Sequence, residues 1–195
     1  MTLFDLVFVL VFLSSVVAIV WVSVTLARGR REQARRIGRR LVIAVVAYVG
    51  FVVAVALASP QRYSALGAAQ CSDDWCITAD SVHRDTIGAT VTYTVGFALS
   101  SRAGRVAQRE RFVVAYLRDA DGRRIDAQAD ARAIPFDTLL EPGQTIRARR
   151  RFVVTRIARD VGLVIAREGG FRFPGCCIIG DESSLLHKHT IVRLE

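Results

Sequence analysis

The chain has 195 residues and a formal net charge of +9, with 27 basic against 18 acidic side chains. The excess is concentrated: seven arginines lie between residues 28 and 40, whereas residues 59–195 carry 20 basic and 16 acidic side chains, a net charge of +4. That balance, without a basic stripe interleaved with aromatic residues, excludes the nucleic-acid-binding class. Arginine outnumbers lysine 26 to 1, which is typical of a GC-rich bacterial genome.

Two apolar stretches, Leu6–Ala27 and residues 41–58, bracket the arginine-rich segment. A helix rises about 1.5 Å per residue, so each stretch is about long enough to cross a hydrocarbon core of about 30 Å. We therefore predict a transmembrane hairpin over residues 1–58, with spans at about 4–27 and 41–58 and a loop at 28–40.

The loop also predicts the orientation of the hairpin, because short arginine-rich loops stay in the cytoplasm. The N-terminus and everything after Ala58 then lie outside, in a multi-pass protein of the bacterial cytoplasmic (inner) membrane. Anionic lipid headgroups of the inner leaflet are the expected neighbours of the loop. The topogenic residues are Arg28, Arg30, Arg31, Arg35, Arg36, Arg39 and Arg40.

The second apolar stretch carries two further patterns. Ala47, Gly50 and Ala54 lie along one helix face, where small side chains allow close approach of two helices; genome composition explains these residues equally well. Ala56-Leu57-Ala58 resembles the small-x-small cleavage site of a secretory signal. The apolar run is longer than a usual signal core and a first span precedes it, so we expect an uncut anchor.

After a linker at residues 59–70, the hydrophobic period changes to two, which indicates β-strands. Residues 90–99 form the clearest strand, with threonines opposite an apolar face of Val91, Tyr93, Val95, Phe97 and Leu99. Residues 145–155 alternate in the same way. Their predicted inward side is Ile146, Ala148, Phe152 and Val154, and their outward side is Arg147, Arg149 and Arg151.

Further strands are predicted at residues 75–82, 111–118, 161–167 and 189–194. The strand at 111–118 is apolar on both faces and is therefore expected in the middle of a sheet. Asp119–Gly122 predicts a hairpin turn and Glu141–Gln144 a tight turn, since Gly122 and Gly143 permit positive φ. Pro135 lacks an N–H, which places its segment at an edge or in a loop. Short strands separated by turns predict an antiparallel β-sandwich over residues 71–195.

The segments "YLRDADGRR" and "LLEPGQTIRARRRFVV", following a period-two strand, resemble the small immunoglobulin-like domains of bacterial membrane-anchored proteins of unknown function. In those domains an Asp-x-Asp-Gly hairpin ends one strand and a Pro-Gly turn precedes another. The resemblance covers about residues 90–154. It implies an immunoglobulin-like sandwich displayed outside the cytoplasm and does not imply an activity.

All four cysteines fall in the predicted outer domain: Cys71, Cys76, Cys176 and Cys177. An even number of cysteines in an oxidising compartment predicts structural disulfides. Cysteines that are adjacent in sequence, such as Cys176 and Cys177, rarely bond to each other. We therefore expect two cross-links, each joining Cys71 or Cys76 to Cys176 or Cys177. Such bridges close loops of about 100 residues, worth up to about 4–5 kcal/mol in the chain-entropy model. Phe171, Phe173 and Pro174 are then expected beside Trp75.

Metal or redox chemistry at the cysteines is the alternative. The four cysteines together with His187 and His189 offer soft ligands for copper or zinc. Their spacing matches no zinc template, and no Cys-x-x-Cys motif supports thiol–disulfide exchange. We predict no cofactor and no catalytic residue. The expected function is a membrane-anchored, non-enzymatic interaction or accessory module, with membrane lipid and another envelope protein as partners and no nucleic acid.

Overall fold

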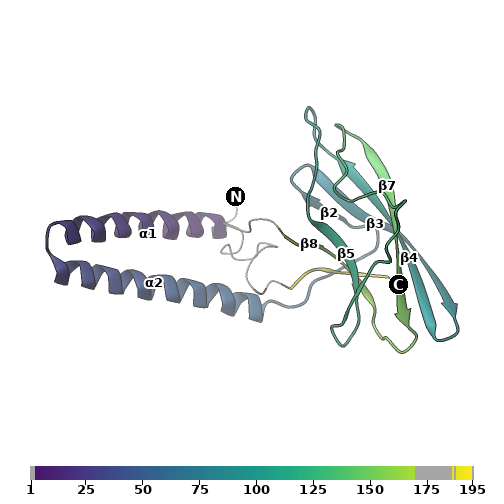
Figure 1. The fold of residues 1–195 in the computed structure, drawn as a ribbon, viewed down its shortest axis with the longest axis horizontal. Helices are drawn as coiled ribbons and strands as arrows, with labels where there is room; N and C mark the ends of the chain where they lie inside the picture. Colours follow the sequence, from purple (N-terminus) through teal and green to yellow (C-terminus); the bar gives the residue numbers. More distant parts are fainter. Residues whose placement is uncertain (1–2, 170–185, 187, 195) are drawn as a thin grey trace. The chain divides into compact units, whose positions relative to one another are not determined.

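The computed structural model describes residues 3–169, 186 and 188–194, and its chain divides into two compact units. The hairpin unit holds the two helices together with Lys188, and the sandwich unit holds the strands of residues 61–169 and 189–194. Figure 1 shows the helices as one antiparallel pair and the strands as two layers. Each unit is described separately below.

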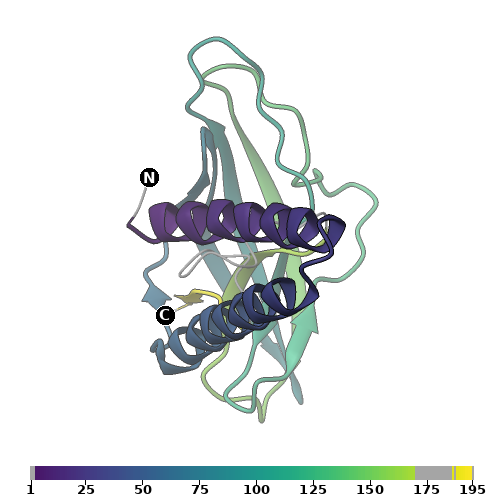
Figure 2. The ribbon, with the colours of Figure 1, turned by 90° about the vertical axis from the view of Figure 1, so that its left-hand side faces the viewer.

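The hairpin unit consists of α1 (Leu3–Ala27) and α2 (Arg31–Ala58), joined by a bend at residues 28–30 that faces the viewer in Figure 2. Both helices are long and apolar enough to cross a membrane. The hydroxyls of Ser15 and Ser23 donate back along the helix, Ser15 to the Val11 carbonyl oxygen at 2.7 Å and Ser23 to the Ile19 carbonyl oxygen at 3.0 Å, so these two polar groups are satisfied within α1.

The prediction that residues 28–40 form a loop is wrong for most of that segment. Helix α2 already begins at Arg31, so five of the seven topogenic arginines lie on its first three turns. Arginine is a good helix former, and Glu32 in the first turn favours the helix N-terminus. Glu32 also lies 3.6 Å from Arg36, four residues further on.

The small-residue face predicted for helix packing does not pack in the described hairpin. The buried residues of α2 are Ala34, Val52 and Ala56, whereas Ala47, Gly50 and Ala54 are exposed. A Cβ placed on Gly50 would meet no described atom within 4 Å. Close helix approach therefore does not explain these small residues.

The sandwich unit consists of two sheets, which confirms the predicted β-sandwich. One sheet has the order β1-β9-β8-β5-β6, with β1 (Tyr63–Ser64), β9 (Ile191–Arg193), β8 (Gly162–Arg167), β5 (Val113–Arg118) and β6 (Arg124–Asp126). The other has the order β2-β3-β4-β7, with β2 (Ala69–Ser72), β3 (Trp75–Ile87), β4 (Thr90–Ser101) and β7 (Thr145–Thr155). All pairings are antiparallel except that of β1 with β9.

The core lies between the sheets and consists of the side chains that the alternation placed inward. Phe97 and Leu99 of β4, Phe152 of β7, Leu117 of β5 and Leu163 of β8 are fully buried. Strand β5 has a neighbour on each side, as its apolar character predicted.

The predicted turns are confirmed, with Gly122 at φ +79° between β5 and β6 and Gly143 at φ +72° before β7. Residues 134–136 lie outside every strand, also as predicted. Phe136 nevertheless enters the core and meets Phe97 edge to face, with ring centroids 5.1 Å apart.

Candidate functional site

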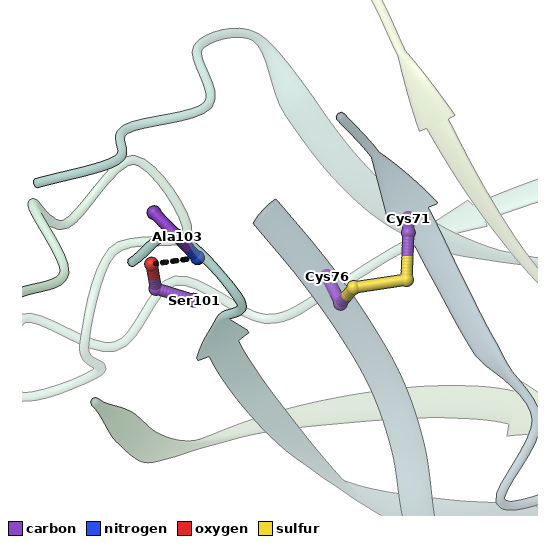
Figure 3. The surroundings of a disulfide bond; sticks show 4 residues. All are labelled: Cys71, Cys76, Ser101 and Ala103. Atoms are coloured by element: carbon purple, nitrogen blue, oxygen red, sulfur yellow. Dashed lines mark hydrogen bonds between the residues drawn. A yellow bond between two sulfur atoms is a disulfide. The ribbon is translucent and has the colours of Figure 1, made fainter. Parts of the chain in front are cut away.

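Cys71 and Cys76 form a disulfide across the β2–β3 hairpin (Figure 3). The two residues are direct partners in the antiparallel register, with Cα atoms 4.0 Å apart. Asp73, at φ +51°, and Asp74 form the turn between them. Side chains that face each other on antiparallel strands are close enough to bond, so this short hairpin supplies each sulfur with its partner.

The predicted cross-links from Cys71 and Cys76 to Cys176 and Cys177 are therefore wrong. The turn at Asp73 and Asp74 places the first two cysteines opposite each other, so they form a short bridge in place of the two long ones. The bridge spans five positions. In the chain-entropy model, so short a loop gives about 2 kcal/mol in place of the 4–5 kcal/mol expected for the long ones.

The remaining residues of the predicted cysteine site lie outside the described residues: Cys176, Cys177, His187, Phe171, Phe173 and Pro174. His189 is described and belongs to the sandwich unit, where its backbone carbonyl oxygen accepts a hydrogen bond from Gln61. Within the described part of the chain, no three His, Cys, Asp or Glu side chains gather closely enough to hold a metal ion. In its disulfide form the Cys71–Cys76 pair offers no thiolate ligand.

The surroundings of the disulfide are those of a structural brace. Cys76 is fully buried, and Trp75 beside it packs into the core. The end of β4 is joined to the same hairpin, because the Arg102 N–H donates to the Asp74 carbonyl oxygen at 2.7 Å. Ser101 is buried, and its hydroxyl accepts from the Ala103 N–H at 3.3 Å (Figure 3). Asp73 and Asp74, in the turn between the two cysteines, are exposed.

A groove that the sequence did not predict lies where the first and last strands of the sandwich unit meet. It has a volume of about 360 Å³ and is lined by Tyr63 of β1, Asp160 before β8, Gly162 of β8, and Ile191 and Arg193 of β9. Its lining residues come from opposite ends of the unit in sequence. No local motif therefore marks it.

A second hollow of about 530 Å³ shares Tyr63, Asp160 and Ile191 with the groove and adds the turn after β5. Asp121 and Asp160 line it without an ion pair to any described residue, and Asp160 has a positive φ of 47°. Arg193 stacks on Tyr63, with its guanidinium carbon 5.0 Å from the ring centroid. The described side chains of the groove form no nucleophile–base pair.

A charged cluster occupies one edge of the five-stranded sheet. The Arg124 guanidinium lies 4.2 Å from the centroid of the Tyr116 ring, donates to Asp126 at 2.6 Å and also bonds to Glu168. The hydrogen bond with Glu168 holds the pKa of Arg124 above its usual range. Burial raises the pKa of the Tyr116 hydroxyl, and the nearby Arg124 charge opposes that rise. The cluster is satisfied within the unit and is structural.

The outward arginines of β7 are the most distinctive exposed feature of the four-stranded sheet. Arg147, Arg149 and Arg151 are exposed, as the alternation predicted, and we call these three residues the arginine ladder. Arg150 lies between them on the opposite face and is half-buried. The sequence pattern predicted the ladder as the outward side of a strand and did not mark it as a binding site.

Comparisons with known proteins identify no family for this chain. No protein-family model matches it, and no curated protein matches it.

Several solved structures resemble parts of the chain at low identity. One is an uncharacterized β-sandwich protein from Clostridium difficile 630, with 9% identity, a TM-score of 0.43, and coverage of 70% of this chain and 97% of that one. The yjhA protein from Bacillus subtilis has 13% identity, a TM-score of 0.45, and coverage of 67% and 98%. The secreted protein MPT63 from Mycobacterium tuberculosis has 14% identity, a TM-score of 0.41, and coverage of 58% and 94%.

Proposed function

We propose that this protein is a membrane-anchored, non-enzymatic interaction module of the bacterial cytoplasmic membrane. Helices α1 and α2 cross the membrane, and the N-terminus and the sandwich unit lie outside the cytoplasm. The sandwich unit is of the immunoglobulin-like type and presents its exposed sheet face to another envelope protein or polymer. Membrane lipid is the partner of the hairpin, and nucleic acid is not a partner.

The carrying observation is the concentration of arginines at one end of an apolar helix pair. Arg28 and Arg30 lie in the bend, and the other topogenic arginines follow on the first three turns of α2. Positive charge at a short connection between spans favours the cytoplasmic side. This supports placing the other ends of both helices outside.

Lys188, the single lysine of the chain, supports an interfacial position for the far end of α2. Its ammonium donates to the carbonyl oxygens of Leu57 at 3.2 Å and Ser59 at 2.8 Å. A cation favours the negative end of a helix dipole and keeps its charge near water at a membrane boundary.

The copper, zinc or thiol-redox alternative gains no support from the described residues. Two of its proposed ligands, Cys71 and Cys76, are bonded to each other. A bridge that is half buried and built into a β-hairpin supports a bracing role for these cysteines.

Protease protection in spheroplasts tests the topology. With a tag after Glu195, external protease is expected to remove the tag and digest the sandwich unit, while an epitope between Arg28 and Arg31 stays protected. A tag that is digested only after the membrane is lysed would overturn the proposal.

Photo-crosslinking in intact cells tests the interaction role. A photoreactive amino acid at Thr94, on the exposed face of β4, is expected to give a discrete adduct. The matched control places it at Arg159, an exposed loop position away from that sheet face. Equal labelling from both positions, or none from either, would contradict an interaction face on this sheet.

A further inference from the structure

The arginine ladder presents three identical charges at regular intervals. Residues at alternate positions of a strand share a face and lie about 6.6–6.8 Å apart, so Arg147, Arg149 and Arg151 form a straight row on β7. Strand β7 ends the order of its sheet, so the row runs along a margin of the sandwich unit.

The ladder has no partner within the described part of the sandwich unit. Four other strand arginines do: Arg124 and Arg167 are paired with carboxylates, and Arg84 and Arg193 lie over tyrosine rings. For the three ladder guanidiniums, the described residues provide no ion pair, side-chain hydrogen bond or aromatic contact. Their charges are therefore available to an outside ligand.

The strand beside the ladder carries only small side chains, and the Asp80 carboxylate and Ser81 hydroxyl of β3 lie over its Gly96. Ala98, Gly96 and Thr94 of β4 lie directly opposite Arg147, Arg149 and Arg151 in the register. A specific interface with a folded protein normally has an aromatic or large apolar anchor at its centre, and a single-stranded nucleic acid site has aromatic rings on which bases stack. Neither feature lies beside these three arginines. A flat row of like charges instead fits an extended chain with a repeated negative charge.

We propose that the arginine ladder binds an extracytoplasmic phosphodiester polymer without nucleobases. A guanidinium forms two parallel hydrogen bonds to a phosphate, and successive phosphates of an extended polymer can occupy successive arginines. Thr94 adds a hydroxyl donor beside the row. This inference deepens the proposed interaction role and rests on it for the location of the polymer.

Arginine footprinting with a purified polymer tests the inference at the level of single residues. The full chain, in nanodiscs of zwitterionic lipid, is treated with phenylglyoxal in the presence of poly(glycerol phosphate), and modified arginines are mapped by mass spectrometry. The ladder is expected to be protected, whereas the equally exposed Arg123, Arg132 and Arg159 are not. Inorganic phosphate at the same total phosphate concentration is expected to protect none of them.

A charge-matched pair of variants adds an affinity measurement. Arg147→Gln/Arg149→Gln/Arg151→Gln is expected to weaken poly(glycerol phosphate) binding about tenfold or more. Losing three phosphate contacts is also expected to lower the slope of log affinity against log salt concentration by about two. Arg123→Gln/Arg132→Gln/Arg159→Gln removes the same charge elsewhere and is expected to change binding less than about twofold.

Three results would overturn the inference: protection spread evenly over all exposed arginines, equal protection by polyglutamate, and tighter binding of oligothymidylate than of poly(glycerol phosphate). The second would indicate an acidic protein as the partner, and the third a nucleic acid. All three are measured on purified protein, so a result that contradicts polymer binding does not bear on the proposed membrane topology. A wrong topology is detected separately by the tag after Glu195.

Discussion

The guanidinium carbon of Arg150 lies 4.1 Å from the centroid of the Phe136 ring, in a row of inward-facing residues on β7 that are otherwise apolar. Its Nη2 donates to the Ile134 carbonyl oxygen at 2.8 Å, and its Nη1 to the Arg149 carbonyl oxygen at 2.7 Å. Burial lowers the pKa of Arg150, yet these acceptors and the ring replace part of its lost hydration. The residue thus ties the loop at 134–136 to the sheet.

Replacing Arg150 by alanine is therefore expected to lower the free energy of unfolding by about 1–2 kcal/mol. The loss combines the contact with Phe136 and the two carbonyl oxygens left without a donor. Urea unfolding of the full chain in detergent micelles measures it, with Trp75 fluorescence as the probe in a Trp21→Phe background.

Arg149→Ala is the matched control for Arg150→Ala, because Arg149 is the exposed neighbour on the same strand. It is expected to change the free energy of unfolding by less than about 0.5 kcal/mol. Equal effects of the two substitutions would contradict a structural role for the contact between Arg150 and Phe136.

The disulfide assignment predicts a specific peptide and a modest energy. Digestion without reduction is expected to yield a fragment in which Cys71 is linked to Cys76, and replacing both by serine is expected to cost about 2 kcal/mol. Recovery of Cys71 linked to Cys176 or Cys177 would refute the assignment. A loss near 4–5 kcal/mol would point to a much longer closed loop.

Alternation along the chain was sufficient to predict the long strands. In β4 and β7 a period of two over more than ten residues separates core from solvent, and both strands lie within two residues of their predicted bounds. Strands β1, β2 and β6 are only two to four residues long, which is too short for a period to be recognised. These short segments become strands because the backbone of a neighbouring strand supplies their hydrogen-bonding partners.

The candidate sites were predictable only where a single strand forms them. The ladder follows from alternation within residues 147–151 alone. The groove at Tyr63 and Arg193 requires the pairing of β1 with β9, across more than a hundred residues. The Cys71–Cys76 bond required recognising a turn at Asp73, where a non-glycine residue adopts positive φ.

Tyr116 predicts a loss of stability at alkaline pH. Burial raises its pKa above the ordinary tyrosine value of 10.0, so the folded state holds the phenolic proton more tightly than the unfolded state. Its contribution is complete below about pH 10 and is lost as the pH rises through the folded-state pKa. Urea midpoints of the wild type are expected to fall as the pH rises above about 10, and those of Tyr116→Phe to fall less. Parallel curves for the two proteins would contradict the argument.

The packing at Gly162 of β8 leaves little space between this strand and β9, the last strand of the sandwich unit. A Cβ at this position would lie 2.2 Å from Cγ2 of Ile191, an atom fixed to a β-branched carbon on β9. Gly162→Ala is therefore expected to lower the free energy of unfolding by about 1–3 kcal/mol, because β9 must shift away from β8. Gly104→Ala is the control, since its Cβ would meet nothing within 4 Å and it is expected to change stability by less than about 1 kcal/mol.

A double-mutant cycle separates this clash from a general intolerance of alanine at position 162. Ile191→Ala removes the methyl group that Gly162→Ala would strike, so the double variant is expected to be more stable than the sum of the two single losses predicts. Urea unfolding of the four proteins, at one pH and one detergent concentration, measures the coupling. Strict additivity would show that Ile191 does not limit the space at Gly162, and that the pairing of β9 with β8 tolerates a side chain there.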